Sequence, residues 1–440
     1  MRSHIMRLSW ISMRLSWISV LLALPVYAQL KTESVAGNEA VANEVLVKFR
    51  NTNAPGLAEA LQANNIDGAR GVGTKGWVLL HSSTESTASM IGKLQSRGDV
   101  ADVEPNYVVY AFDTIPDDPF FPSLYGMMKI AAPAAWDFTT GSAANVVAVV
   151  DTGLNYDHPD LVDNVWSAPA DFTVTIGGVD ITCAAGTHGF NAINRTCNPL
   201  DDHGHGTHTS GTVGAVGNNG IGVVGVSWTT SVMGVKFLSA GGSGSLADAI
   251  AGMEFTIQTK AIFADLANVR VLSNSWGGGG PSNAFRDELI STRDNEMLFV
   301  AAAGNNNSDN DRSPFYPANY GDSGSPIYVE NVISIMATTA ADTRASFSNY
   351  GQTTVHLGAP GVNILSTSRT GGYVQMSGTS MSTPHVSGAA ALILSICDMD
   401  TPTLKQLLMD SVDPIDALSQ FSITGGRLNV ANAVTACIPP

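Results

Sequence analysis

The sequence is poor in charged residues, and in basic residues above all. Only 14% of its 440 residues are charged, and 22 Lys and Arg stand against 38 Asp and Glu, which gives a net charge of −16 at pH 7. Nucleic-acid binding needs a basic face for the phosphates, so we exclude a nucleic-acid partner. The apolar share of 44% instead indicates a large packed core in a chain that exceeds one ordinary domain.

Long hydrophobic runs are also missing. Beyond the leader, no stretch reaches about 18 consecutive apolar residues, so we expect no membrane-spanning helix and no membrane partner. Near the start, Arg14 precedes the apolar stretch 17–24, and Val26-Tyr27-Ala28 places small residues at the usual cleavage positions. These features predict a signal peptide at residues 1–28 and a secreted, extracellular protein.

Cysteine is rare, and its four positions fall into two pairs along the chain. Cys183 and Cys197 bracket a short polar loop, and Cys397 and Cys437 lie near the end. In an oxidising compartment we favour disulfides between the nearer neighbours, although four cysteines allow three connectivities. Because none of the four has Cys-x-x-Cys spacing, a metal site is disfavoured.

Residues 29–115 have the pattern of a small α+β unit. Alternating and apolar stretches predict strands and helices that would cover one sheet with two helices. The predicted strands are 45–49, 77–80 and 103–110, and the predicted helices are 57–64 and 88–94. Residues 113–119 hold two prolines and three acids and predict an exposed linker.

From residue 117 onward, β-branched apolar runs alternate with helical patterns. This alternation predicts an α/β fold with a doubly wound parallel sheet flanked by helices, whose site lies at the carboxyl ends of the strands. The predicted strands are 146–150, 232–236, 269–275, 298–303 and 332–335, and a helix is predicted at 246–259.

Ser380 follows the small residues 377–379 and precedes the apolar run 386–394, so we expect it at the start of a buried helix. There its hydroxyl either caps the helix or, with a base within reach, acts as a nucleophile. Asp151 ends the strand at 146–150, where an aspartate is either a turn residue or a functional carboxylate. Other motifs decide between these alternatives.

The stretch 202–212 holds three histidines, His203, His205 and His208. Either they form a metal cluster, or one of them is a general base for a serine hydroxyl. A helical zinc site needs a His pair at i and i+4 with a Glu after the first, and this spacing is absent. We therefore favour a base, which would need a buried carboxylate to orient it.

Asn305 follows the predicted strand at 298–303. Asparagines in such loops are often turn residues, but a side-chain amide here could also donate to an oxyanion formed at Ser380. Together the motifs Asp151-Thr152-Gly153, His205-Gly206-Thr207-His208, Ala303-Gly304-Asn305 and Gly378-Thr379-Ser380-Met381-Ser382 resemble, in this order, the signatures of the subtilisin-like serine peptidases. The residues 118–121 and 132–136 are similar to the thermitase-like branch of that family.

This resemblance, which covers about residues 117–437, implies a secreted serine endopeptidase that acts through an acyl-enzyme. Ser380 would be the nucleophile, His205 the base and then the acid, Asp151 the orienting carboxylate, and Asn305 an oxyanion donor. A binding protein with a dead site is disfavoured because all four positions are intact. An esterase with the same triad is disfavoured by the extended substrate edges described below. We expect a monomer.

The resemblance also assigns the segment 29–115. It is similar to the inhibitory propeptide of the family, a ferredoxin-like α+β unit that implies a self-processed zymogen with the peptidase domain at 117–440. We expect processing between residues 111 and 116. The alternative is a separate binding domain that the mature protein keeps.

The family pairs substrate strands with backbone on both sides of its cleft. The segments Gly242-Ser243-Gly244 and Ser275-Trp276-Gly277 match these two edges, although both could be ordinary glycine-rich turns. Trp276 stands where a leucine is frequent, which implies a narrower subsite upstream of the cut. Phe315 stands where the family builds the floor of its primary pocket, and because no acid matches that floor we expect apolar or uncharged residues before the cut.

A structural Ca²⁺ is implied as the cofactor. A family site of carboxylate, amide and backbone oxygens, the donors that a hard cation requires, matches Asp118, Asp160 and the loop residues Val216, Asn218, Ile221 and Val223. The loop has one residue more than the shortest family version, so Asn219 could replace Asn218. The alternative is a set of solvated acids beside a Gly-Asn turn.

The polar insertion 171–200 has no firm counterpart in the family. It contains Cys183 and Cys197 and lies just before His205. It either forms a disulfide-closed surface loop or borders the cleft.

Overall fold

The computed structural model describes residues 31–35, 38–50, 65–108 and 114–438, and the chain divides into two units at residue 113. The proposed signal peptide at 1–28 lies outside the described residues. Each unit is treated by itself.

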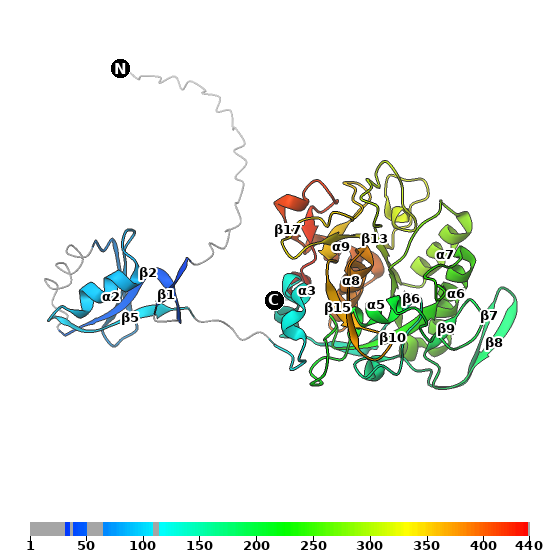
Figure 1. The fold of residues 1–440 in the computed structure, drawn as a ribbon, viewed down its shortest axis with the longest axis horizontal. Coiled ribbons are helices and arrows are strands. Elements are labelled where there is room, and N and C mark those ends of the chain that lie inside the picture. Colours follow the sequence, from blue (N-terminus) through cyan, green and yellow to red (C-terminus); the bar gives the residue numbers. More distant parts are fainter. Residues whose placement is uncertain (1–30, 36–37, 51–64, 109–113, 439–440) are drawn as a thin grey trace, which may run out of the picture. The chain divides into compact units, whose positions relative to one another are not determined.

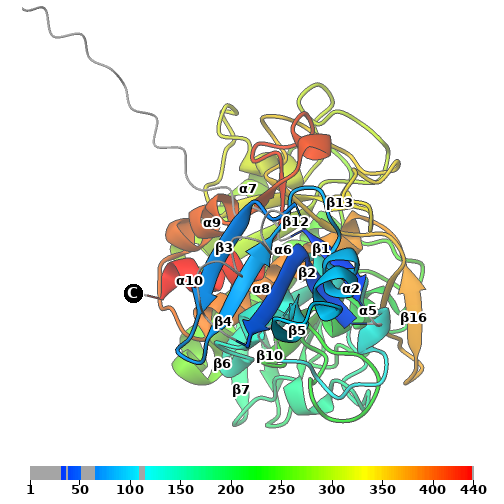
Figure 2. The same ribbon diagram turned by 90° about the vertical axis from the view of Figure 1, so that its left-hand side faces the viewer.

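The first unit contains an antiparallel sheet in the order β1-β2-β4-β3, with β5 paired to β2. Figure 2 shows β2, β4 and β3 side by side. The helix α2 begins after Ser86, whose hydroxyl accepts a hydrogen bond from Ser89 N–H, and it buries Met90 and Leu94 against the sheet. The bounds are β1 Thr32–Val35, β2 Asn38–Phe49, β3 Gly68–Val72, β4 Trp77–His81, α2 Thr87–Gln95 and β5 Val100–Tyr107.

Most of the pattern predicted for this unit is present. The predicted strands at 45–49 and 77–80 fall in β2 and β4, and the described part of the predicted strand 103–110 falls in β5. The predicted helix at 57–64 lies outside the described residues, so the ferredoxin-like arrangement stays a prediction. The strand β3 was not predicted, because its sequence GARGV is mostly exposed and has no apolar alternation.

The second unit is built on a nine-stranded sheet in the order β17-β18-β14-β13-β12-β11-β6-β10-β9. All neighbours pair in parallel except β17 and β18. The strands are β6 Gly141–Asp151, β9 Gly189–Asn191, β10 Thr229–Lys236, β11 Val269–Asn274, β12 Leu298–Ala302, β13 Val332–Thr338, β14 Leu357–Pro360, β17 Asp413–Pro414 and β18 Gly426–Arg427. The parallel α/β architecture expected from the sequence is therefore confirmed.

Helices cover both faces of this sheet (Figure 1). Along β6, Val147 and Val149 point to the core shared with α8, while Val146, Ala148 and Val150 point to the core shared with α6 and α7. Because both faces are buried, the strand is a continuous apolar run rather than an alternating one. The helices are α3 Tyr125–Lys129, α4 Ala132–Trp136, α5 His205–Gly214, α6 Leu246–Phe263, α7 Asn283–Asp294, α8 Thr379–Leu394, α9 Thr401–Asp410 and α10 Val430–Cys437.

Two hairpins lie outside the main sheet. The first, β7 Phe172–Ile176 with β8 Val179–Cys183, occupies the insertion 171–200, and the second joins β15 Ile364–Thr367 to β16 Tyr373–Met376. Within the described residues, no helix is both long and apolar enough to span a bilayer.

Candidate active site

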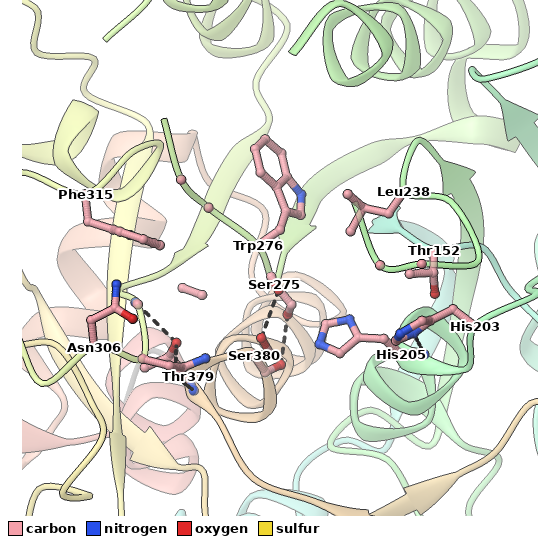
Figure 3. A pocket seen from close by; sticks show the side chains of 17 residues that line it. Thr152, His203, His205, Leu238, Ser275, Trp276, Asn306, Phe315, Thr379 and Ser380 are labelled. Carbon is pink, nitrogen blue, oxygen red and sulfur yellow. Dashed lines mark hydrogen bonds between the residues drawn. The ribbon is translucent and has the colours of Figure 1, made fainter. Parts of the chain in front are cut away.

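A cleft of about 570 Å³ opens where β6, β11 and β12 end and where α5 and α8 begin (Figure 3). Parallel strands bring their carboxyl ends to one edge of the sheet, which is where α/β proteins place their sites. The cleft is lined by Thr152, His203, His205, Leu238, Gly241, Gly242, Ser275, Trp276, Gly277, Gly278, Ala302, Gly304, Asn305, Asn306, Phe315, Thr379 and Ser380.

Asp151 and His205 form a hydrogen-bonded pair at this edge. Asp151 is the last residue of β6 and is fully buried, and His205 is the first residue of α5, with 20% of its side chain exposed. The ring Nδ1 lies 2.7 Å from Oδ1 and 2.9 Å from Oδ2 of Asp151. Because an ionised carboxylate only accepts hydrogen bonds, Nδ1–H is the donor and Nε2 is left free to accept a proton.

The charge on Asp151 also sets the proton affinity of the ring. Burial alone lowers the pKa of His205, but the charge and the hydrogen bond of Asp151 outweigh it and raise the pKa above its usual value. The imidazolium form is therefore stabilised once a proton arrives.

Ser380 lies in the first turn of α8 and is half-buried. Its hydroxyl donates to the Ser275 carbonyl at 2.9 Å, and the Ser275 hydroxyl donates back to the Ser380 carbonyl at 2.9 Å (Figure 3). The hydrogen bonds of the described residues do not include one between Ser380 and His205, although the His205 ring faces the same part of the cleft. Rotation about the Ser380 Cα–Cβ bond turns Oγ between staggered positions, and such contacts often tighten only when substrate binds.

Asn305 is held with its amide nitrogen free. Its Oδ1 accepts hydrogen bonds from the Thr379 N–H at 2.9 Å and the Thr379 hydroxyl at 3.0 Å, so Nδ2 remains as a donor. A methyl group placed on Gly378 would lie 3.4 Å from Asn305 Nδ2 and 3.6 Å from the Ser380 backbone nitrogen. Two N–H donors therefore converge beside Ser380, and the Ser380 N–H belongs to the first turn of α8, where N–H groups lack helical partners.

Asp201 supports the loop that carries His205, and the sequence did not single it out. Its carboxylate is buried and accepts from the backbone N–H groups of His203, Gly204 and Thr207 and from the hydroxyls of Thr152 and Thr207, at 2.6–3.0 Å. Burial alone raises the pKa of Asp201, but these hydrogen bonds outweigh it and lower the pKa. The available signal was its position four residues before His205 at a helix start.

Lys236 is a second supporting residue that the sequence did not reveal. It ends β10 directly beside Asp151 in the sheet, and only 4% of its side chain is exposed. Its ammonium donates to the carbonyls of Thr152 and Leu238 and to the carboxylate of Asp202, at 2.6–2.8 Å. One buried cation thus ties together the strand end that carries Asp151, the Leu238 side of the cleft and the loop before His205.

The three histidines of the motif do not converge on a common point. His208 is buried, its Nε2–H donates to the carbonyls of Ile364 and Val374, and burial lowers its pKa to about 4. His203 is exposed, and its ring centroid lies 6.3 Å from that of His205. Throughout the described ranges, no group of three His, Cys, Asp or Glu side chains is placed to hold a metal.

The two predicted substrate edges lie along the same cleft system. Gly242 and the segment 275–277 line the cleft beside Ser380, and Gly242-Ser243-Gly244 and Trp276 also line an adjoining hollow of about 360 Å³. Trp276 is half-buried and packs edge to face on Phe237 and Phe285, with ring centroids 4.7 and 5.8 Å away. The indole is therefore held in place by two aromatic rings where it lines this hollow.

The residues predicted to bind Ca²⁺ are brought together. Asp118 and Asp160 are buried, and they accept the N–H groups of Asn218 and Val223 at 2.7 and 2.8 Å. Asn219 donates its side-chain amide to Asp160 at 2.9 Å. Val216 and Ile221 belong to the same loop. The donors of residues 216–223 thus wrap around two carboxylates.

One oxygen at this place has no partner. Asp118 Oδ1 is buried without a hydrogen bond. Burial raises the pKa of Asp118 to about 6, with a contribution from the charge on Asp160, and burial likewise raises the pKa of Asp160. Two buried carboxylates with an orphaned oxygen fit a hard cation, whose other ligands would be amide and backbone oxygens.

Two disulfides link the nearer neighbours among the cysteines, Cys183 with Cys197 and Cys397 with Cys437. The first closes the insertion 171–200. Its hairpin packs on α6, where Phe172 contacts the rings of Phe255 and Phe263. None of the described residues of this insertion lines the cleft, so its position favours a surface loop over a border of the cleft.

The sequence of this chain is similar to those of known proteins. The model of the Subtilase family matches residues 142–430. The chain is 33% identical to Thermophilic serine proteinase of Bacillus sp. (strain AK1) over 400 residues, which cover 90% of this chain and 88% of that protein. It is also 33% identical to Thermitase of Thermoactinomyces vulgaris over 320 residues, which cover 72% of this chain and 99% of that protein.

Solved structures agree with these sequence matches. A protease of Pseudoalteromonas arctica PAMC 21717 superimposes with a TM-score of 0.58 at 28% identity, covering 74% of this chain and all of that chain. A cold adapted subtilisin-like serine proteinase superimposes with a TM-score of 0.50 at 28% identity, covering 66% of this chain and 90% of that chain.

Proposed function

This chain belongs to the subtilase family and is a serine endopeptidase, and from this premise we propose that it cleaves proteins with Ser380, His205 and Asp151 as its triad. The observation that carries the proposal is the buried Asp151–His205 hydrogen bond beside Ser380 at the start of α8. The donors of Asn305 and the Ser380 backbone face the same place.

The first half of the reaction forms an acyl-enzyme. His205 Nε2 takes the hydroxyl proton as Ser380 Oγ attacks the scissile carbonyl, and Asp151 stabilises the imidazolium that results. Asn305 Nδ2 and the Ser380 N–H donate to the negatively charged oxygen, helped by the positive end of the α8 dipole. His205 then gives the proton to the leaving amine. In the second half, water replaces the amine and His205 repeats the proton transfer.

Substrate binding would use backbone pairing along the two edges 242–244 and 275–277. Among the described residues that line the cleft, none is an Asp or Glu, so a Lys or Arg side chain before the cut would lack a charge partner. We therefore expect an apolar or uncharged residue there. The narrow hollow beside Trp276 would restrict a residue further upstream.

The remaining features extend the proposal to the whole chain. Residues 1–28 would direct secretion, and residues 29–115 would act as an intramolecular inhibitor until they are cut off, leaving a monomeric peptidase at 117–440. Ca²⁺ bound by Asp118, Asp160 and oxygens of Val216, Asn218, Ile221 and Val223 would neutralise two buried carboxylates and stabilise their loop.

Replacement of the nucleophile tests the central assignment. Ser380→Ala and His205→Ala should each abolish casein hydrolysis in a protein that stays folded, and a serine-directed phosphonate should label only a protein with Ser380. The matched control is Ser377→Ala, because Ser377 is exposed on the same turn and bonds only to Asn363 in the described structure. Undiminished casein turnover by the Ser380→Ala protein would refute the assignment. Greater activity on a short ester than on casein would favour an esterase.

A further inference from the structure

The part of the cleft that receives the residue before the cut has two walls, each ending in a glycine. Ser275-Trp276-Gly277 follows β11, and Ala303-Gly304 follows Ala302, the last residue of β12. The attacked carbonyl must lie at Ser380 and Asn305, so the side chain on the Cα atom next to it enters the space between these walls. The size of that space therefore limits the size of this side chain.

The ring of Phe315 already occupies this space. A methyl group on Gly277 would lie 2.3 Å from Phe315 Cε1 and 2.7 Å from Cζ, and one on Gly304 would lie 3.1 Å from Phe315 Cδ1. One edge of the ring thus reaches into the notch between the two walls, and Gly277 must be glycine to make room for it. Gly304 is needed mainly for another reason, because its φ is +111° and a methyl group there would lie 2.4 Å from Asn349 Nδ2. Figure 3 shows the ring directed into the cleft.

The backbone around Phe315 is fixed. Its N–H donates to Asn319 Oδ1 at 2.8 Å, and its carbonyl accepts from Asn319 N–H at 2.9 Å. Next to it, the Tyr316 carbonyl accepts from Gly278 N–H at 2.8 Å, which joins this segment to one wall of the pocket. Asn319 is buried and donates to the Asn310 carbonyl at 3.0 Å. The backbone segment that carries the ring is therefore held on both sides by hydrogen bonds.

We propose that Phe315 closes this pocket and restricts the enzyme to small side chains, Gly, Ala or Ser, at the residue before the cut. The proposal rests on the proposed function and narrows its expectation of an apolar or uncharged residue to a size class. A Leu or Phe side chain would need the volume that the ring fills, and close-packed protein interiors resist such overpacking. One or a few extra carbons in a filled pocket change kcat/KM by about 10–200-fold.

Hydrolysis of tetrapeptide p-nitroanilides that differ only in the last residue tests the proposal. For the wild-type enzyme, kcat/KM with Ala should exceed kcat/KM with Phe or Leu by about 10-fold or more. In Phe315→Gly, which vacates the pocket, the Phe-to-Ala ratio should rise by about 10–200-fold. Phe315→Val, which keeps a branched apolar side chain, should give a smaller rise and serves if the glycine variant does not fold.

The control variant is Phe263→Ala, which removes another aromatic side chain near the end of α6 that contacts Trp166 and Phe172 instead of the cleft. Its Phe-to-Ala ratio should equal that of the wild type. Wild-type enzyme that cleaves after Phe or Leu as fast as after Ala would overturn the size restriction while leaving the peptidase assignment intact. Failure to cleave any of the peptides, or casein, would instead count against the proposed function.

Discussion

Single residues of the candidate site differ in how visible they are in the sequence. Asp151, His205, Asn305 and Ser380 stand in recognisable motifs, and the structure brings them to one cleft. Lys236 was not predicted because its partners Thr152 and Asp202 lie far from it in the chain. Asp201 was not predicted either, although most of its partners belong to the nearby segment 203–207. In the sequence Asp201 stands beside Asp202, which is typical of a solvated turn. Only the structure shows that five donors form hydrogen bonds to its carboxylate. Lys236 ends an apolar strand, a position where a lysine is usually exposed. Only the pairing of β10 with β6 shows that it lies beside Asp151.

The pH dependence of the reaction should be set by the pair of His205 and Asp151. His205 must be neutral to act as a base, and Asp151 raises its pKa, so kcat/KM should fall as the pH drops through a value above the usual 6.5 or so. In Asp151→Asn the charge is gone while burial, which lowers the pKa, remains. The acid limb should then move to lower pH, and the plateau should fall by about 10⁴-fold.

Steady-state kinetics from pH 4 to 10 on one peptide substrate would check this. An acid limb that stays in place in the Asp151→Asn enzyme would mean that another group controls the titration. Asp157→Asn, which changes an exposed carboxylate outside the cleft, should leave the limb unmoved.

A strand can be predicted from the sequence where both of its faces are buried, because its residues then form a continuous apolar run. The five predicted strands all lie within or overlap strands β6, β10, β11, β12 and β13, and the predicted helix 246–259 is the first part of α6. The strand β14, with the sequence LGAP, and the two-residue strands β17 and β18 carry no such run. Their pairing depends on the sheet that is already formed, which a local pattern does not contain.

The stability of the loop 216–223 is expected to depend on bound Ca²⁺. Removal of Ca²⁺ with EGTA should accelerate thermal inactivation, because bound cation stabilises the folded state by about 2.7 kcal/mol at a hundredfold excess over its Kd. Asp118→Asn should weaken this response, since it removes the carboxylate with the orphaned oxygen. Inactivation half-lives with EGTA and with added Ca²⁺ give the measurement.

Asp157→Asn is again the matched control, because this neighbouring acid is exposed, and it should keep the wild-type response to EGTA. If the half-life of the wild-type enzyme were the same with chelator and with added Ca²⁺, the loop would bind no stabilising cation. The two buried carboxylates would then have to be accommodated by protonation, consistent with their raised pKa values.

The whole molecule consists of two units that differ in size and in what the sequence reveals of them. The larger one is recognisable from four motifs and an alternating strand and helix pattern. The smaller one has no catalytic motif, and its role rests on resemblance, because an inhibitory segment acts through its shape and needs no catalytic side chains. A binding domain that the mature protein keeps is therefore the alternative role for residues 29–115.

Processing of the full chain separates these two roles. Wild-type protein should lose residues up to a point between 111 and 116, whereas Ser380→Ala should keep them because self-cleavage needs the nucleophile. N-terminal sequencing and intact mass of both secreted proteins would show the difference. Active wild-type enzyme that still begins at Gln29 would identify the segment as a retained domain.

The spread of the site along the chain also has a consequence in time. Asp151, His205, Asn305 and Ser380 lie far apart in the sequence and are synthesised in that order, so Ser380 is the last of the four to leave the ribosome. At about 5–20 residues per second, the interval between Asp151 and Ser380 is on the order of tens of seconds. During all of it the growing chain has no complete triad. The proposed inhibitor, residues 29–115, is synthesised before all four residues, so it is already present when the triad becomes complete.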